Sequence, residues 1–282
     1  MKIIVKEEGE LLNYLYNHLD IPKKRIKQYL THGSIYVNNN KTTKYNTKIV
    51  PGMTIVIDTD NKNKKTLPFD ILMEDEHIIV VNKPSGLLTI ATNKEKEKTL
   101  YHIVREYLIS KNKNAKVFIV HRLDKDTSGI VVLAKDEKTK NKLQENWNEY
   151  VTLREYVAVV HGTLEKKENQ IIQKLKETKT NLVYVTKEDD GKEAITNYKV
   201  IKESNNYSMI SIEIETGRKN QIRVAMASLN HPIVGDKKYG DKQDKENRLY
   251  LHANRLKMYY PEIKKELLFE TATPNEFKKI MN

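Results

Sequence analysis

The feature that most constrains the fold is a charged segment between two short β-branched runs. Residues 121–129 read His-Arg-Leu-Asp-Lys-Asp-Thr-Ser-Gly, and the apolar runs 117–120 and 130–134 flank them. A strand that enters a charged loop and returns to a strand places charges where burial is costly unless they pair or react. This segment is therefore the first candidate for chemistry. The alternative is a simple hairpin in which Asp124 and Asp126 accept turn hydrogen bonds.

Length and composition limit the class of protein. The chain has 282 residues, enough for a large and a small domain. Mean hydropathy is -0.68, no apolar run approaches the length of a membrane span, and charge at Lys2 and Lys6 is too early for a signal peptide. We expect a cytoplasmic protein without membrane association. The absence of cysteine excludes disulfides, thiolate zinc sites and a thiol nucleophile.

The net charge of +12 predicts a polyanionic partner. Residues 1–66 hold 12 Lys and Arg against 6 Asp and Glu, so +6 of the +12 lies in under a quarter of the chain. This concentration favours nucleic acid. A general Lys and Asn bias of the organism's proteins is the alternative interpretation.

The N-terminal residues predict two helices followed by short strands. Leucines at helical spacing indicate a helix over 10–19, and Asp20 with Pro22 announces a second helix that ends near Gly33. Strands are expected over 34–38 and 54–57. The second helix carries a basic cluster, which consists of Lys23, Lys24, Arg25 and Lys27.

This order resembles the RNA-binding module of ribosomal protein S4. The resemblance covers 10–58 and depends on Gly-Ser-Ile-Tyr-Val-Asn at 33–38 and on Gly52 before the last strand. It implies a small α/β RNA-binding domain at 1–58 whose basic cluster contacts RNA. Pro22-Lys23-Lys24-Arg25 replaces the usual Ser-Arg, and Met53 replaces an aspartate, so the contacts differ in detail. A helical cap with a solvated lysine face is the alternative.

The remaining chain predicts a linker at 59–67 and a second domain at 68–282. The linker is polar and rich in lysine. Strands in close succession are expected over 156–160, 168–175, 181–186, 195–201 and 207–214. Helices are expected over 100–108, 139–149, 220–229 and in the C-terminal tail. The second domain is therefore assigned to the α+β class, with a mostly antiparallel sheet and helices packed on it.

Two further segments carry candidate binding residues. Thr216-Gly217-Arg218 precedes an apolar helix whose first turn contains Arg223, and glycine with helix N-terminal amides favours an anionic partner. Taken alone, Arg223 is better explained as a surface arginine of the helix. Lys83 ends a strand before Pro84-Ser85-Gly86 and is either solvated or in contact with phosphate.

Three motifs together resemble the large-ribosomal-subunit type of pseudouridine synthase, the RluA/RluD family. They are His-Arg-Leu-Asp-x-x-Thr-Ser-Gly at 121–129, Arg-Glu-Tyr-x-Ala-x-Val-x-Gly at 154–162 and Thr-Gly-Arg-x-x-Gln-Ile-Arg at 216–223. The resemblance implies an isomerase that detaches uracil from its ribose in RNA, turns the ring and rejoins it through carbon 5. It implies ribosomal RNA as substrate, with transfer RNA as the alternative, and a monomer without cofactor or metal.

The resemblance also assigns roles to residues. Asp124 matches the family's nucleophile, Arg223 the arginine that pairs with it and keeps it ionised, and Tyr156 the tyrosine that stacks on uracil and assists proton loss at carbon 5. Arg122 matches the arginine that fills the gap left by the flipped uridine. The phosphate-facing or supporting residues are Lys83, Arg218 and His121.

Departures and rivals accompany this assignment. Lys219-Asn220 stands where the family has a hydroxyl residue and a histidine, Ala225 where it has a histidine, and Arg154 where lysine is common. A uridine 5-methyltransferase would need the absent thiol. A glycosidase that uses Asp124 and Asp126 as its carboxylate pair, and a non-catalytic RNA-binding protein on the same scaffold, stay open as alternatives.

Overall fold

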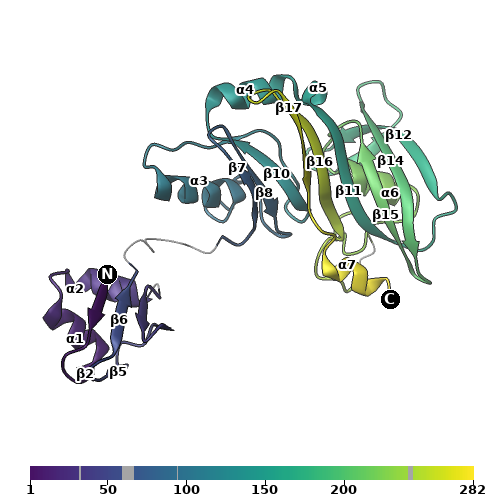
Figure 1. Ribbon diagram of the computed structural model, residues 1–282. Helices are drawn as coiled ribbons and strands as arrows, with labels where there is room; N and C mark the ends of the chain where they lie inside the picture. Colours follow the sequence, from purple (N-terminus) through teal and green to yellow (C-terminus); the bar gives the residue numbers. More distant parts are fainter. Residues whose placement is uncertain (32, 59–66, 94, 241–243) are drawn as a thin grey trace. The chain divides into compact units, whose positions relative to one another are not determined.

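The computed structural model describes residues 1–31, 33–58, 67–93, 95–240 and 244–282 (Figure 1). The chain divides into two compact units, Met1–Thr66 and Leu67–Asn282. The division falls in the predicted linker, of which residues 59–66 lie outside the described residues.

The first unit contains two helices and short antiparallel strands. Its helices are α1 (Leu11–His18) and α2 (Lys23–Thr31). Its strands are β1 (Lys2–Ile4), β2 (Gly9–Glu10), β3 (Ile35–Val37), β4 (Asn40–Thr42), β5 (Lys48–Ile49) and β6 (Thr54–Ile57). Among the described residues, a sheet has the order β1-β6-β3-β4, and β2 pairs with β5. The helices and the strands β3 and β6 agree with the predictions, whereas β1, β2, β4 and β5 were not predicted.

The amphipathic pattern of α2 separates a core face from a basic face. Ile26, Tyr29 and Leu30 are buried in the core of the first unit together with Leu11 and Leu15 of α1. The four residues of the basic cluster are exposed: Lys23, Lys24, Arg25 and Lys27. Apolar residues at spacings of three and four thus anchor the helix and leave the charges in solvent.

The second unit is built on one large sheet. Within the described residues this sheet has 11 strands in the order β13-β12-β14-β15-β11-β16-β10-β8-β7, with β17 beside β16 and β9 beside β10. All pairs are antiparallel except β10 with β16. The strands are β7 (Ile71–Glu74), β8 (Ile78–Lys83), β9 (Phe118–Ile119), β10 (Ser128–Ala134), β11 (Val151–His161), β12 (Glu168–Glu177), β13 (Val183–Thr186), β14 (Lys192–Glu203), β15 (Tyr207–Ile214), β16 (Leu251–Tyr260) and β17 (Lys265–Glu270). The predicted α+β class with a mostly antiparallel sheet is confirmed.

Helices cover both faces of the sheet around β8 and β10. The helices of this unit are α3 (Leu100–Lys111), α4 (Glu137–Glu145), α5 (Trp147–Tyr150), α6 (Gln221–Ser228) and α7 (Asn275–Ile280). On one face, Val81 and Leu133 pack with α3, and on the other, Val80 and Val132 pack with Leu143 of α4. Both faces of these strands are apolar because successive side chains point to opposite sides, and both sides are covered.

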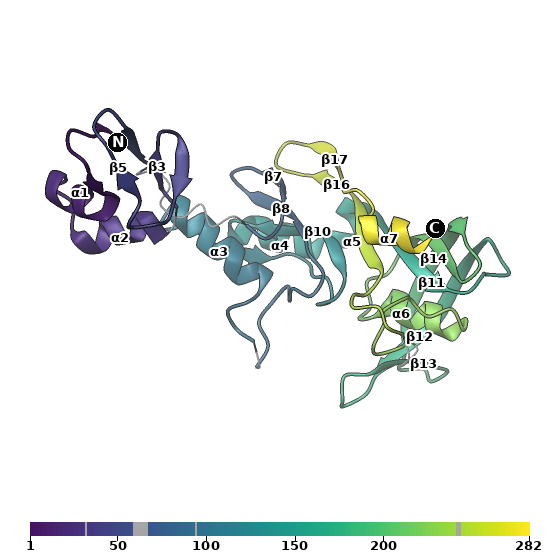
Figure 2. The same ribbon diagram turned by 90° about the horizontal axis from the view of Figure 1, so that it is seen from below.

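Two predictions on helices and strands need correction. The predicted helix 139–149 is divided into α4 and α5 at Asn146, whose side chain donates to the carbonyl of Lys142 and whose backbone leaves the helical region. Strands β16 and β17 were not predicted, although β16 lies at the centre of the sheet beside β11 (Figures 1 and 2). No secondary structure was assigned to residues 251–270 from the sequence.

Gly129 permits the parallel contact between β10 and β16. Its φ is +121°, and a Cβ atom built on it would lie 2.2 Å from the carbonyl oxygen of Ala253. No other residue type fits this close approach, because any side chain would collide with the backbone of β16. The glycine therefore fixes where β10 begins and where the preceding charged loop stands. Among the described helices, none is long and apolar enough to cross a membrane.

Candidate active site

The charged loop before β10 is held on both sides of Asp124. Thr89 donates its hydroxyl to the carbonyl of Leu123 at 2.7 Å and accepts from the amide of the same residue at 3.3 Å. Lys83 donates its ammonium to the carbonyl of Lys125 at 3.0 Å. Because the neighbours of Asp124 on both sides are fixed, its carboxylate is presented from a rigid backbone.

Lys83 corrects a prediction. We expected it to contact RNA phosphate, but its side chain is completely buried and donates to the carbonyls of Pro84, Leu87 and Lys125 at 2.8 to 3.0 Å. Burial lowers its pKa to about 7. Three carbonyl acceptors use all three N–H donors of the ammonium group, so Lys83 supports the loop and does not reach a ligand.

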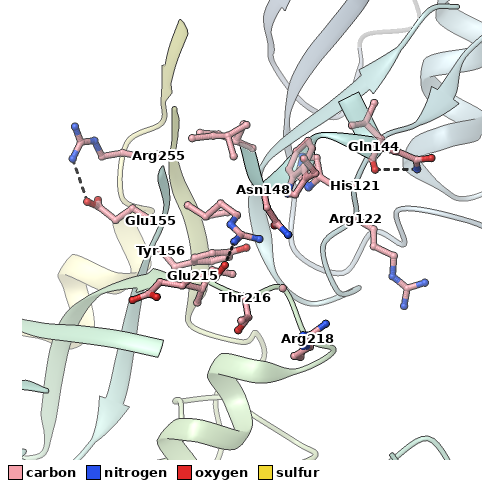
Figure 3. Close-up of a pocket in the computed structure, with 18 residues that line it drawn as sticks. His121, Arg122, Gln144, Asn148, Glu155, Tyr156, Glu215, Thr216, Arg218 and Arg255 are labelled. Carbon is pink, nitrogen blue, oxygen red and sulfur yellow. Dashed lines mark hydrogen bonds and ion pairs between the residues drawn. The ribbon is translucent and has the colours of Figure 1, made fainter. Parts of the chain in front are cut away.

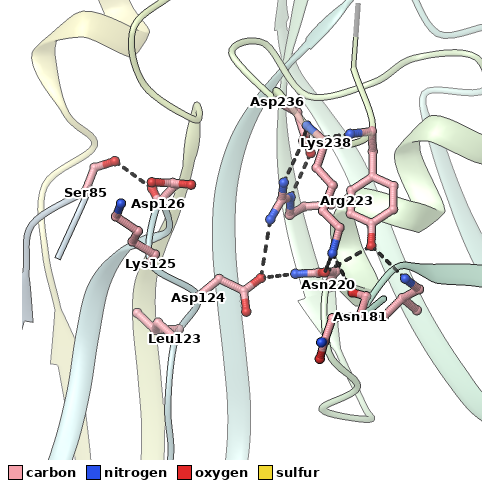
Figure 4. Close-up of polar contacts among 12 residues, drawn as sticks. Ser85, Leu123, Asp124, Lys125, Asp126, Asn181, Asn220, Arg223, Asp236 and Lys238 are labelled. Atoms are coloured by element: carbon pink, nitrogen blue, oxygen red, sulfur yellow. Dashed lines mark hydrogen bonds and ion pairs between the residues drawn. The ribbon is translucent and has the colours of Figure 1, made fainter. Parts of the chain in front are cut away.

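Arg223 connects Asp124 to a second carboxylate. Its Nε and Nη2 donate to the two oxygens of Asp236 at 2.8 and 2.6 Å, while Nη1 lies 3.7 Å from Oδ2 of Asp124 (Figure 4). Burial alone would lower the pKa of Arg223, but Asp236 and then Asp124 raise it. Burial alone would raise the pKa of Asp236, but Arg223 lowers it. The expected pair with Asp124 is present as the longer contact, and the bidentate partner is Asp236.

Gly235 explains how Asp236 reaches this position. Its φ is +74°, and an added Cβ would lie 1.7 Å from the carbonyl oxygen of Arg248. The turn therefore requires glycine immediately before the aspartate. Asp236 is 1% exposed and also accepts from the amides of Lys238 and Tyr239. Its carboxylate is therefore held by these two amides as well as by Arg223.

Asn220 is the second group that contacts Asp124. It precedes α6 in the left-handed conformation, with φ 54° and ψ 18°, which asparagine tolerates better than most residues. Its side chain does not cap the helix, and its amide nitrogen donates to Oδ2 of Asp124. Its amide oxygen accepts from the hydroxyl of Tyr239 at 3.0 Å and from the ammonium of Lys238 at 3.3 Å. These two donors orient the amide toward Asp124.

Tyr156 stands on β11 and lines the same cavity as Asp124. The cavity has a volume of about 100 Å³, and Arg223, Asn220 and Arg122 also line it. Burial raises the pKa of Tyr156 to about 12, with nearby Arg154 opposing and the charge of Asp124 adding to the rise. The ring is therefore a protonated phenol at neutral pH, suited to stacking and to hydrogen-bond donation.

The structure thus brings the three expected catalytic residues together, but not the two carboxylates of the glycosidase alternative. Asp124, Tyr156 and Arg223 share the cavity of about 100 Å³, whereas Asp126 does not line it and is exposed. Ser85 donates to the carbonyl of Asp126 at 2.6 Å, as expected for a turn residue. A carboxylate pair of the glycosidase type is therefore not assembled in this cavity.

The expected RNA-binding residues fall into two groups. Arg122 and Arg218 are exposed and line both the small cavity and a larger neighbouring cavity of about 510 Å³. His121 lines the larger cavity only. Lys23, Lys24, Arg25 and Lys27 belong to α2 of the first unit.

Sequence analysis missed three contributors to the site. Asp236 lies 112 positions after Asp124, and only the Gly-Asp step after an apolar run could have indicated it. Asn220 was noted as a departure from the family pattern, without its contact to Asp124. Arg154 was noted as a mild change, although it lines the larger cavity.

Comparisons with known proteins identify the family of the chain. Residues 77–228 match the RNA pseudouridylate synthase family. An uncharacterised RNA pseudouridine synthase of Bacillus subtilis, YhcT, is 30% identical over 98% of this chain and 93% of its own length. Ribosomal large subunit pseudouridine synthase D of Vibrio cholerae is 31% identical over 91% of this chain and 85% of its own length.

Solved structures show the same fold. Human RNA pseudouridylate synthase domain containing 1 covers 78% of this chain and 89% of its own, with a TM-score of 0.62 and 21% identity. The chain belongs to the RNA pseudouridine synthase family. It is accordingly an isomerase that acts on RNA, as the resemblance of the three motifs predicted.

Proposed function

We propose that this protein converts uridines of ribosomal RNA to pseudouridine, with Asp124 as the nucleophile. The observation that carries the proposal is the position of the Asp124 carboxylate. It lines a cavity of about 100 Å³ beside Tyr156, and Asn220 and Arg223 hold one of its two oxygens. The name of the Vibrio cholerae relative supports a ribosomal substrate. We further propose that the enzyme acts as a monomer in the cytoplasm.

The reaction keeps all atoms of the substrate. The bond between N1 of uracil and C1′ of ribose breaks, the ring turns, a bond forms between C5 and C1′, N1 gains a proton and C5 loses one. Asp124 assists the cleavage by attack on C1′ or on C6 of the ring. Arg223, kept charged by Asp236, favours the ionised form of Asp124. No step requires an external oxidant, reductant or cofactor.

Tyr156 and Arg122 act on the base and on the RNA stack. Tyr156 offers a flat aromatic surface for the uracil ring. Because burial raises its pKa to about 12, the phenol is protonated at neutral pH and stacking is its first role; proton removal at carbon 5, its second role, requires the phenol to give up its own proton first. Arg122 is exposed at the mouth of the cavity, in a position to fill the gap that the flipped uridine leaves.

We also propose that the first unit is an S4-like RNA-binding domain. Its basic cluster on α2 is exposed, and none of its members forms an ion pair among the described residues. Exposed cations on one helix face attract phosphates in a salt-dependent way. This unit adds affinity for structured RNA, while the second unit carries the reaction.

Tritium release tests the proposal. Ribosomal RNA transcribed in vitro with 5-tritiated uridine is incubated with wild type, Asp124→Asn and Asp126→Asn. Asp126→Asn is the matched control, because it removes one charge from the same loop outside the cavity. We expect release by wild type and by Asp126→Asn, and only background with Asp124→Asn. No release by wild type would contradict the ribosomal substrate, and equal release by all three would contradict the role of Asp124.

A further inference from the structure

The larger cavity is continuous with the catalytic one. It has a volume of about 510 Å³ and shares Arg122, Tyr156, Gly217 and Arg218 with the small cavity that contains Asp124. Figure 3 shows Tyr156 and Asn148 among the residues that line it. If one base of an RNA strand enters the small cavity, a neighbouring nucleotide of the same strand is brought next to the larger one.

Arg154 gives this cavity an unmatched positive charge. Its side chain is half-buried, and burial lowers its pKa. Its Nη2 donates to the backbone carbonyl of Glu215, and Gly217 lies directly beside its Nη1. Within the described part of the chain it has no carboxylate partner. A guanidinium group withdrawn from water without a counter-anion is unfavourable, unless a ligand supplies the anion.

The two carboxylates that line the cavity do not pair with Arg154. The carboxylate of Glu155 accepts from Asn254 and Arg255, and that of Glu215 accepts from Gln170 and Asn197. Both carboxylates are therefore already engaged. Arg122 and Arg218, at the junction of the two cavities, form no ion pair among the residues described. Several unpaired guanidinium groups around one cavity match the geometry of a phosphate.

An aromatic wall and a free amide complete the cavity. The rings of His121 and Trp147 lie 4.6 Å apart, at 34° to each other. Nε2 of His121 accepts from the amide of Val132, and burial with the charge of Arg154 lowers the pKa of His121 to about 3, so the ring stays neutral. The side-chain amide of Asn148 has no hydrogen-bond partner in the described residues, and it offers both a donor and an acceptor to a base edge.

We propose that this cavity is a binding subsite for the ribonucleotide on the 5′ side of the uridine that reacts. Arg154 binds its phosphate, and its base lies along the wall of His121 and Trp147 within reach of Asn148. The inference rests on the proposed RNA isomerase function and adds a contact that selects the neighbour of the target. Its chemistry is that of a phosphorylated base in single-stranded RNA, with stacking and an arginine-bound phosphate.

Trp147 permits a direct test, because it is the single tryptophan of the chain. The diribonucleotide pUpU, with a 5′-phosphate, is titrated into the full-length protein while tryptophan fluorescence is followed. Calorimetry measures the same affinity independently. The basic cluster of the first unit contains no tryptophan, so the fluorescence change reports on the cavity alone.

We expect pUpU to change the fluorescence of Trp147 and to bind about tenfold or more tightly than UpU without the 5′-phosphate, as charge-assisted hydrogen bonds imply. Arg154→Gln abolishes this preference for the phosphate, and Arg154→Lys retains part of it. Arg255→Gln is the matched control: it lines the same cavity but is paired with Glu155 and Glu270, so its preference stays within about twofold to threefold of wild type.

Three results would overturn the proposal. They are equal affinity for pUpU and UpU in the wild type, an unchanged preference in Arg154→Gln, and binding by calorimetry without any response of Trp147. The comparison of the two ligands in wild type decides the matter even if Arg154→Gln fails to fold. Asp124→Asn, which ends catalysis, is expected to keep the fluorescence response, so failure of the subsite and failure of the proposed reaction are separable.

Discussion

The two neighbouring cavities differ in how an arginine that is withdrawn from solvent is paired: Arg223 is buried and Arg154 is half-buried. Arg223 is held by both oxygens of Asp236 and lies 3.7 Å from Asp124. Arg154 has only a backbone carbonyl among the described residues. Burial opposes the charge of both, but the pKa of Arg223 is raised and that of Arg154 is lowered. The charge of Arg223 is therefore balanced by carboxylates without a ligand, whereas the charge of Arg154 is not.

This difference separates a site built for reaction from a site built for binding. Electrostatic preorganisation requires that catalytic charges be fixed before the substrate arrives, as those around Asp124 are. A binding subsite instead leaves a charge to be completed by its ligand. Substitutions that remove the partner of Arg223 are therefore expected to lower stability. Substitutions that neutralise Arg154 are expected to change only the affinity for the ligand.

The largest effect is expected from Asp236→Ala, which removes the bidentate partner of Arg223. It leaves a guanidinium group that is 8% exposed with a single distant carboxylate. Breaking a buried pair in this way costs about 3–5 kcal/mol of unfolding free energy. Chemical denaturation measures it. A loss below about 1 kcal/mol would show that Arg223 does not depend on Asp236.

A double substitution distinguishes stability from catalysis at the same pair. Arg223→Met with Asp236→Leu replaces both charges by apolar groups, and such replacements are often neutral for stability. We expect the double variant to be more stable than Asp236→Ala and to release no tritium from 5-tritiated RNA. Activity in this variant would contradict the role of Arg223 at Asp124.

An intermediate effect is expected from Asn220→Ala, which removes a hydrogen bond to Oδ2 of Asp124. Loss of one such bond to a charged group lowers kcat about tenfold, with KM for RNA little changed. Tritium release at several RNA concentrations separates the two parameters. Asn220→His, which restores the family's usual residue, is expected to recover part of kcat. An unchanged kcat with a lower melting temperature would reduce Asn220 to a structural residue.

The smallest effect on the reaction is expected in the first unit, whose basic cluster, like Arg154, has no ionic partner among the residues that the structure describes. Replacing Lys23, Lys24 and Lys27 by glutamine should weaken RNA affinity and reduce the slope of log affinity against log salt by about 2. The rate at saturating RNA should stay unchanged. The matched control removes three lysines that are paired with carboxylates, namely Lys167, Lys199 and Lys257. An equal slope in both variants would exclude the cluster from RNA binding.

Prediction of strands from the sequence succeeded for β15 and failed for β16. Strand β15 was predicted with its observed bounds, Tyr207–Ile214, because apolar and polar residues alternate from Ile210 to Ile214 and further apolar residues precede them. Strand β16 was missed, although it joins the two halves of the sheet. Two of its partners, β10 and β11, are far away in the chain, and the parallel contact at Gly129 depends on a close approach that local patterns do not report.

The site was predictable as a set of residues but not as a set of contacts. The motifs indicated Asp124, Tyr156 and Arg223, which the fold brings to one cavity. They did not indicate that Arg223 binds Asp236 more closely than Asp124, because pairing depends on a turn at Gly235. Lys83 was misjudged for a related reason: a lysine at a strand end reads as exposed, and only packing shows that three carbonyls enclose it.

Mapping of pseudouridines in cells tests the central claim most directly. Ribosomal RNA is isolated from a strain that lacks the gene and from the same strain carrying wild type or Asp124→Asn at equal protein levels. We predict that at least one position of ribosomal RNA is uridine in the deletion strain, becomes pseudouridine with the wild type and stays uridine with Asp124→Asn. Identical modification by both proteins would contradict the assignment of Asp124 as the nucleophile.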